Sequence, residues 1–314
     1  MRELVAALAA LVVALVAADG AACERARGPL DAPVALVLSG GGAKGAWEAG
    51  VAITFVEERL PVALVAGSSA GALNAAMLAD GRLARLETLW RTLTRDQVYA
   101  LRASVVASGF LPGFVSLFAV DRARSLFDAG PLRALVTETL DLERVRRSPT
   151  RLLVVTADLA RRAPRIFDNA TITVDALMAA AAVPGAFPPV DVDGDLLVDG
   201  GLVGRAPILE ALAAGTPVAR AIVVMSYAPG EGGRAPTTLR RTLEEALEMA
   251  MIHQIRRDTE LAQLKYPAVD VHLLTPSTPL ALRPLDFDTA GMAAALDRGR
   301  ADAAACLERW RGGR

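Results

Sequence analysis

Short apolar runs and segments with helical spacing alternate along the first part of the chain. The run APVALVLS at residues 32–39 is continuously apolar and bounded by Pro and Gly, which predicts a buried strand. Helical spacing follows at 44–60, then a second apolar run at 61–67 (PVALVAG) and a second helical segment at 69–80. Strand, helix, strand and helix in succession predict a parallel sheet that helices cover.

The same pattern continues through the rest of the chain, without an internal repeat, a low-complexity linker or a second domain. Apolar runs predict further strands at Leu152–Thr156, Leu196–Val198, Ala221–Ser226 and Val269–Leu274. Helical spacing predicts helices at Asp175–Ala182, Leu239–Lys265 and Thr289–Trp310. Residues 230–238 (GEGGRAPTT) are typical of a loop. We therefore expect a single α/β domain over residues 33–314.

One stretch, between residues 101 and 127, departs from this pattern because its apolar sequence is broken by Gly and Pro. It contains four of the eight phenylalanines of the chain, Phe110, Phe114, Phe118 and Phe127. Two interpretations are compatible with each other. The stretch is a mobile cap that admits an acyl chain, or it is a packed helical insert. We place this insert around residues 84–145 and expect chain-length preference to depend on it.

The N-terminal residues have the composition of a leader. Leu4–Ala18 is an uncharged run of Leu, Val and Ala, which is short for a membrane span but suits the core of a signal peptide. Gly20 and Ala22 precede Cys23 much as small residues precede the lipid-bearing Cys of bacterial lipoproteins, although that pattern usually has Leu in place of Gly20. We predict a signal peptide or lipoprotein leader over residues 1–22, hence export with a lipid anchor at Cys23. The alternative is a membrane-associating helix that stays attached to a cytoplasmic protein.

A short linker, residues 23–32, separates this leader from the domain. Cys306 is the only other cysteine, so lipid attachment at Cys23 or its removal would leave no internal disulfide. Neither the cysteine spacing nor the two histidines support a metal site. The net charge of −1 over 314 residues gives no electrostatic case for nucleic-acid binding.

The glycine-rich loop SGGGAKG, residues 39–45, fits two nucleotide-binding patterns poorly. Gly40, Gly42 and Gly45 satisfy G-x-G-x-x-G, but a dinucleotide site also needs an acidic residue at the end of the next strand, and that strand has none. A phosphate-binding P-loop needs Lys after the last Gly, whereas Lys44 precedes Gly45. We therefore predict no cofactor.

The next strand runs into GSSAG, Gly67–Gly71, which fits G-x-S-x-G with Ser69 at its centre. Between a buried strand and a helix, this pentapeptide is typical of a nucleophile elbow. The tight turn lifts the Ser69 hydroxyl clear of the sheet, and the helix directs its N-terminal N–H groups toward the same point. Ser68 is expected to be supporting. The alternative is a plain turn of small residues.

A nucleophilic serine needs a base, and three residues are candidates. His253 lies on the polar face of a predicted helix. His272 lies in a predicted strand and could complete a Ser–Asp–His triad. Asp199 ends an apolar strand in the sequence DGG, although Asp-Gly is also a common hairpin turn. Since a free carboxylate is a weak base, Asp199 requires direct contact with Ser69 and strong stabilisation of the oxyanion, which the N–H groups of the glycine loop can supply.

The motifs GGGAKG, GSSAG and DGG, in this order, resemble the patatin-like phospholipase family, as does AAAVPGAFPPV at residues 180–190. The resemblance runs from about residue 33 to at least residue 204. It implies a three-layer α/β/α domain with a central, mostly parallel sheet. It also implies a Ser–Asp dyad without His that hydrolyses fatty-acyl esters of lipids. The implied roles are nucleophile and base for Ser69 and Asp199, oxyanion hole for Gly40, Gly41 and Gly42, and motif support for Lys44, Gly45, Gly67, Gly71, Gly200 and Gly201.

The expected function is that of a serine lipid acyl hydrolase, of the phospholipase A or lysophospholipase type, which acts on lipid esters at a membrane surface through an acyl-serine intermediate. The alternatives are an esterase with a Ser–Asp–His triad using His272, and a catalytically silent, membrane-anchored lipid-binding protein. Lys44, one of only two lysines, supports the loop or contacts a lipid head group. The lipid class, the acyl position and the oligomeric state stay open.

Overall fold

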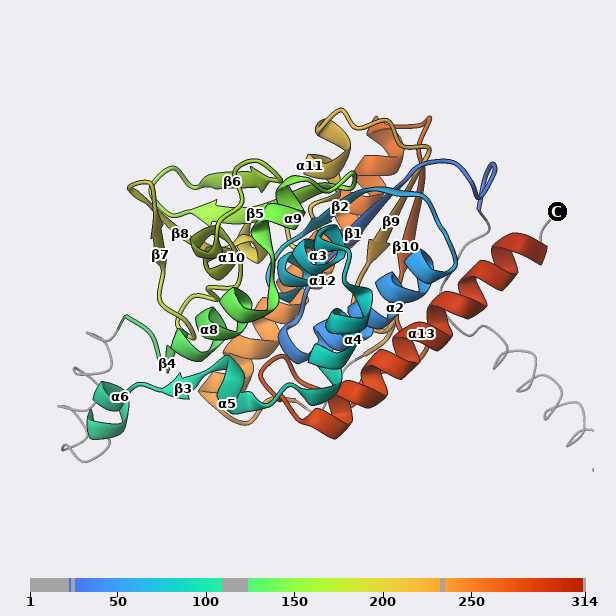
Figure 1. Ribbon diagram of the computed structural model, residues 1–314. Coiled ribbons are helices and arrows are strands. Elements are labelled where there is room, and N and C mark those ends of the chain that lie inside the picture. Colours follow the sequence, from blue (N-terminus) through green and yellow to red (C-terminus); the bar gives the residue numbers. More distant parts are fainter. Residues whose placement is uncertain (1–22, 24–25, 109–123, 232–234, 313–314) are drawn as a thin grey trace, which may run out of the picture.

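A central mixed sheet organises the chain, as seen in a computed structural model that describes residues 23, 26–108, 124–231 and 235–312 (Figure 1). The predicted leader and three of the phenylalanines, Phe110, Phe114 and Phe118, lie outside the described residues. The strand order is β10-β9-β1-β2-β5-β8-β7, and β6 pairs with β5 beside this path. The parallel strands are β1 (Val34–Leu38), β2 (Val62–Gly67), β5 (Arg151–Asp158), β9 (Arg220–Val224) and β10 (Asp270–Leu274). The antiparallel strands are β6 (Ala163–Asp168), β7 (Val190–Val192) and β8 (Asp195–Asp199).

Helices cover both faces of the sheet, because alternate residues of its central strands point to opposite sides. Leu36 and Leu38 of β1 pack under one helical layer, whereas Ala35 and Val37 belong to a separate core on the other side. The first layer contains α2 (Gly45–Glu57), α3 (Ala70–Asp80), α10 (Val174–Ala180) and α13 (Thr289–Gly312). The second contains α11 (Ile208–Ala213) and α12 (Leu239–Lys265). This arrangement confirms the predicted three-layer α/β/α class with a mostly parallel sheet.

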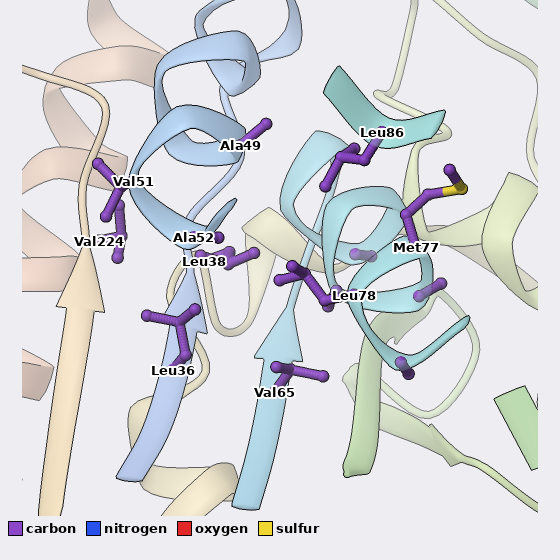
Figure 2. Packing of buried hydrophobic residues seen from close by; sticks show 14 of the residues in the cluster. Leu36, Leu38, Ala49, Val51, Ala52, Val65, Met77, Leu78, Leu86 and Val224 are labelled. Atoms are coloured by element: carbon purple, nitrogen blue, oxygen red, sulfur yellow. The ribbon is translucent and has the colours of Figure 1, made fainter. Parts of the chain in front are cut away.

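Figure 2 shows the first core from close by. Val65 of β2, Leu36 and Leu38 of β1 and Val224 of β9 face helix side chains that include Val51 of α2, Met77 and Leu78 of α3 and Leu86 of α4 (Leu83–Thr92). The strand side chains are β-branched or leucine, which fill a pleated surface well. Small alanines of the helices allow these helices to approach the sheet closely.

The predicted insert is a series of short elements. Its described parts are α4, α5 (Arg95–Val98), β3 (Ala100–Leu101), α6 (Ala103–Ser108), β4 (Phe127–Asp128), α8 (Gly130–Thr139) and α9 (Leu142–Arg146). Leu86 and Trp90 of α4 and Leu132 and Val136 of α8 are buried in the first core. The described helices α4 and α8 are therefore packed elements of the domain.

The predicted elements missed the β7–β8 hairpin and strand β6. The hairpin turn lies at Asp193-Gly194, where both residues have positive φ, as a type I′ turn requires. A hairpin turn at Asp199 was one interpretation of its Asp-Gly sequence. In the structure Asp199 is instead the last residue of β8 and precedes the 3-10 turn η2 (Gly200–Leu202). These strands are short and polar on one side, so their sequence gives a weak signal.

A disulfide joins Cys23, ahead of the first strand, to Cys306 of α13. The Sγ atom of Cys23 cannot carry both this bond and a lipid thioether. The structure thus contradicts the predicted lipid attachment at Cys23, which was the condition under which no internal disulfide could form. Within the described ranges, no helix is long and apolar enough to span a bilayer.

We predict that the Cys306→Ala variant unfolds more easily, by about 2–5 kcal/mol, because the cross-link restricts the unfolded chain. Guanidinium denaturation of the wild type and the variant measures the difference. Wild-type protein treated with a reductant is the control and should match the variant. Equal midpoints for reduced and oxidised wild type would show that the bond is absent or contributes nothing.

Candidate active site

Ser69 lies in a strained turn between β2 and α3. Its φ of 54° and ψ of −137° are unusual for a residue with a side chain. The turn is tight because a Cβ on Gly67 would lie 2.4 Å from the carbonyl oxygen of Gly71, so only glycine fits there. The Ser69 N–H donates to the carbonyl of Ala180 at 2.9 Å, which holds the turn. The strand–turn–helix setting expected of a nucleophile elbow is therefore confirmed.

Ser68, the neighbouring hydroxyl, has a different environment. It is fully buried, and its Oγ donates to the carbonyl of Arg205 at 2.6 Å. This bond attaches the turn to the segment that follows η2. Ser68 is a supporting residue, as its place in the motif indicates.

Asp199 stands beside this turn at the end of β8 and is 2% exposed. Its Oδ1 accepts from the Gly201 N–H at 2.7 Å, whereas Oδ2 receives no hydrogen bond from the described part of the chain. Burial raises the pKa of the Asp199 carboxyl, while the charge of Arg205, the Gly201 N–H and the Ser69 hydroxyl each lower it. The fold thus brings Ser69 and Asp199 together from strands that are distant in the sequence.

The glycine loop after β1 has fewer N–H groups available to bind an ester oxyanion than its sequence predicts. The Gly40 N–H donates to both carboxyl oxygens of Glu48 at 2.9 Å, so it is not available to an ester oxygen. This corrects the prediction that Gly40 is an oxyanion donor. The N–H groups of Gly41 and Gly42 have no acceptor among the described residues, and both glycines have positive φ. The Ala70 N–H, at the first turn of α3, is an additional candidate donor.

Glu48 is a fully buried acid on α2 that organises this loop. Besides the Gly40 N–H, its Oε1 accepts from the Ser39 hydroxyl at 2.7 Å. Burial raises the pKa of Glu48 to about 8, against the lowering effect of these two donors and of the Arg205 charge. Sequence reasoning missed Glu48, although an acid within an otherwise apolar helical segment is a visible signal.

Lys44 is also buried, and its Nζ lies 2.7 Å from Oε1 of Glu231 and 4.0 Å from the centre of the Tyr227 ring. Glu231 in turn accepts from the Ala228 N–H. These contacts tie the glycine loop to the turn after β9. They favour loop support over head-group contact as the role of Lys44.

Neither histidine makes a contact with this pair among the described interactions, although His253 lines the same cavity as Ser69. Nε2 of His272 is 2.8 Å from Oδ2 of Asp270, and its ring lies against Trp310, on the side of the disulfide. Among the interactions of the described residues, none joins His272 to Ser69 or Asp199. His253 is exposed on α12, as its polar helix face predicts. The structure therefore disfavours a triad with His272.

A cavity of about 1110 Å³ opens onto Ser69. Apolar residues of the lining come from the first helical layer and the insert, with Met77, Leu89, Trp90, Leu132 and Leu135, and from Ile252 of α12. Polar residues of the lining come from the glycine loop, the segment after η2 and α12, with Lys44, Arg205, Glu245, Glu248 and Arg256. The cavity can accommodate a molecule with an apolar tail and a polar head. Within the described residues, no cluster of His, Cys, Asp and Glu could hold a metal.

A model of the patatin-like phospholipase family matches residues 36–212, more than half of the chain, so the chain belongs to this family. An uncharacterized NTE family protein of Mycobacterium tuberculosis is 30% identical over 188 residues, which are 60% of this chain and 48% of that protein. Human patatin-like phospholipase domain-containing protein 6 is 28% identical over 190 residues, 59% of this chain and 13% of that protein. The chain therefore spans about half the length of the mycobacterial relative and a smaller part of the human one.

Among solved structures, VipD from Legionella pneumophila aligns with a TM-score of 0.48 and 14% identity. The alignment covers 92% of this chain and 70% of that one.

We predict a pH-dependent effect of Glu48→Gln on stability. In the folded protein the pKa of Glu48 is about 8, whereas its ordinary value is 4.5. The stabilisation of the folded state by the protonated Glu48 is therefore complete below the ordinary pKa and is lost as the pH rises to 8. The amide of the variant does not ionise. The free energy of unfolding should thus shift in favour of the variant by up to about 1.4 kcal/mol per pH unit between about pH 5 and 8. Denaturant unfolding across this range measures it, and equal pH slopes would contradict it.

Proposed function

We propose that the protein is a serine lipid acyl hydrolase that uses a Ser69–Asp199 dyad. The observation that supports this most strongly is that a strained, cavity-facing serine meets a buried carboxylate, whose Oδ2 accepts no hydrogen bond from the described residues. Family membership supports lipids as the substrates. The apolar lining residues suit the acyl chain, and the polar lining residues suit the head of the lipid.

In the proposed mechanism, Asp199 takes the proton of the Ser69 hydroxyl as Oγ attacks the ester carbonyl. The N–H groups of Gly41, Gly42 and Ala70 stabilise the oxyanion, each worth about 10²–10³ in rate in comparable sites. The alcohol or lysolipid leaves with a proton, and an acyl-serine remains. Water then attacks this ester while Asp199 again accepts the proton.

The ionisation of Asp199 is the main electrostatic requirement of this mechanism. Burial favours the protonated form, which cannot act as a base. The charge of Arg205 and the Gly201 N–H oppose this effect and favour the carboxylate.

We predict that Ser69→Ala and Asp199→Asn each lower hydrolysis of a chromogenic medium-chain acyl ester by at least about 10³-fold. Circular dichroism and thermal unfolding should show that both variants stay folded. His272→Gln is the matched control and should retain activity. Activity retained in Asp199→Asn and lost in His272→Gln would replace the dyad with a triad.

A fluorophosphonate probe separates this enzyme from a catalytically silent lipid-binding protein. The probe should label Ser69 in the wild type, and mass spectrometry should find no label in Ser69→Ala. A Ser69 that stays unlabelled in a protein that still binds lipid vesicles would favour the binding protein.

We also propose that the protein is exported and acts at a membrane surface. The Cys23–Cys306 disulfide supports export, because such bonds persist in oxidising compartments. Fractionation of the native cells with an antibody to the protein tests this. Recovery in the reducing cytoplasm, with free thiols by mass spectrometry, would contradict it.

A further inference from the structure

The helix that follows the nucleophile turn, α3, lines the cavity with a stripe that begins next to Ser69. Four of its lining residues are spaced three and four positions apart and therefore share one face of the helix. These residues are Ala70, Leu73, Asn74 and Met77. Asn74, the polar member, is paired on both sides, because its Nδ2 donates to the carbonyl of Gly45 and its Oδ1 accepts from Nε1 of Trp90. The stripe therefore offers an apolar surface to a ligand.

Two helices of the insert line the cavity with stripes of the same spacing. The stripe of α4 includes Leu86, Leu89 and Trp90. The stripe of α8 includes Leu132, Leu135 and Thr139. Met77 of α3 and Leu86 of α4 lie on the same side of the sheet (Figure 2). We call the space between the stripes of α3, α4 and α8 the apolar arm of the cavity.

Polar contacts between helices bound the end of the apolar arm that is remote from Ser69. Nη2 of Arg82 donates to the carbonyl of Thr139 at 3.1 Å, and Nη2 of Arg85 donates to that of Glu138 at 2.6 Å. These bonds hold the start of α4 against the end of α8. The two helices of the insert therefore converge where α3 ends.

The carboxyl group of Asp80, the last residue of α3, lies at the same point, and its side chain has no exposed surface. It accepts from Nε of Arg82 and from Nε of Arg144, each at 2.9 Å, and from the N–H of Asp141 at 3.4 Å. Leu140, which lines the cavity, directly precedes Asp141. The apolar arm ends at this junction, because a hydrocarbon chain that displaced these ion pairs would leave a buried charge unpaired.

The spacing of the α3 stripe gives the length of the apolar arm. Ala70 and Met77 are seven residues apart, which corresponds to about 10 Å along a helix. An extended hydrocarbon chain advances about 1.25 Å per carbon, as its bond length and bond angle require. A chain of about eight carbons therefore extends from Ser69 to the end of the stripe.

We propose that the apolar arm binds the acyl chain and accommodates about eight to ten carbons, so that the enzyme prefers medium-chain to long-chain acyl esters. Each CH₂ group buried in the arm strengthens binding, whereas the carbons of a longer chain find no further apolar surface there. Two of the three stripes come from the insert, which thereby sets the chain length. This proposal rests on the acyl hydrolase activity proposed above.

The test measures kcat/KM for a series of 4-nitrophenyl esters, from butanoyl to tetradecanoyl, at concentrations below those at which they aggregate. In the wild type, kcat/KM should rise about fourfold per added carbon. The rise should stop at about eight to ten carbons, and longer esters should gain nothing more or react more slowly. This break in the series is the quantity that the variants should move.

Two variants should move the break in opposite directions. Leu140→Ala enlarges the far end of the arm and should move the break to chains about two carbons longer. Leu135→Phe fills the arm at an earlier point and should move it to chains about two carbons shorter. Leu159→Ala, at an exposed leucine that does not line the cavity, is the control and should leave the break in place. Thermal unfolding shows whether each variant is folded, and either variant alone suffices.

Labelling of Ser69 by alkyl fluorophosphonates of increasing length is a second readout that needs no ester turnover, and its rate should show the same break. A rise that continues to the tetradecanoyl ester would overturn the proposal. So would a break that stays in place in a folded Leu140→Ala or Leu135→Phe variant. Ester hydrolysis that persists in Ser69→Ala, with no labelling of Ser69 in the wild type, would instead overturn the proposed function itself.

Discussion

Close backbone packing where β1 and β2 end is the constraint on which the rest of the site depends. A Cβ on Gly40 would lie 2.7 Å from the carbonyl oxygen of Ser68, and a Cβ on Gly71 would lie 2.5 Å from that of Leu38. The glycine loop and the nucleophile turn can touch only because these side chains are missing. This contact sets the glycine loop against Ser69 and the start of α3, because a Cβ on Gly40 would lie 2.9 Å from Cβ of Ser69 and 3.0 Å from the backbone nitrogen of Gly71.

This packing also has an electrostatic consequence. The loop and the turn enclose two carboxyl groups, Glu48 and Asp199, and burial raises the pKa of both. The Arg205 charge lowers both. Glu48 has hydrogen-bond donors for its oxygens and a structural role, whereas one oxygen of Asp199 accepts no hydrogen bond from the described residues. Two buried carboxyl groups therefore serve two purposes, and the local hydrogen-bond donors make the difference.

Much of the framework could be predicted from local patterns. The helix α12 begins and ends where its spacing predicts, because a long periodic segment gives a strong signal. Strand β2, the GSSAG turn and α3 follow in the predicted order. The short strands β6 and β7 and the Asp193-Gly194 hairpin were missed, because their pairing partners, more than their own sequence, make them strands.

The sequence by itself determined the order of elements, the nucleophile turn and the carboxylate after β8, because glycines, small residues and apolar runs restrict the backbone locally. Only the tertiary structure decided which groups meet. In the folded protein the Gly40 N–H donates to Glu48, and Cys23 forms a disulfide with Cys306. Lys44 forms an ion pair with Glu231, and Arg205 lines the cavity. These contacts join residues from different elements, and burial and charge at such contacts depend on how the layers pack.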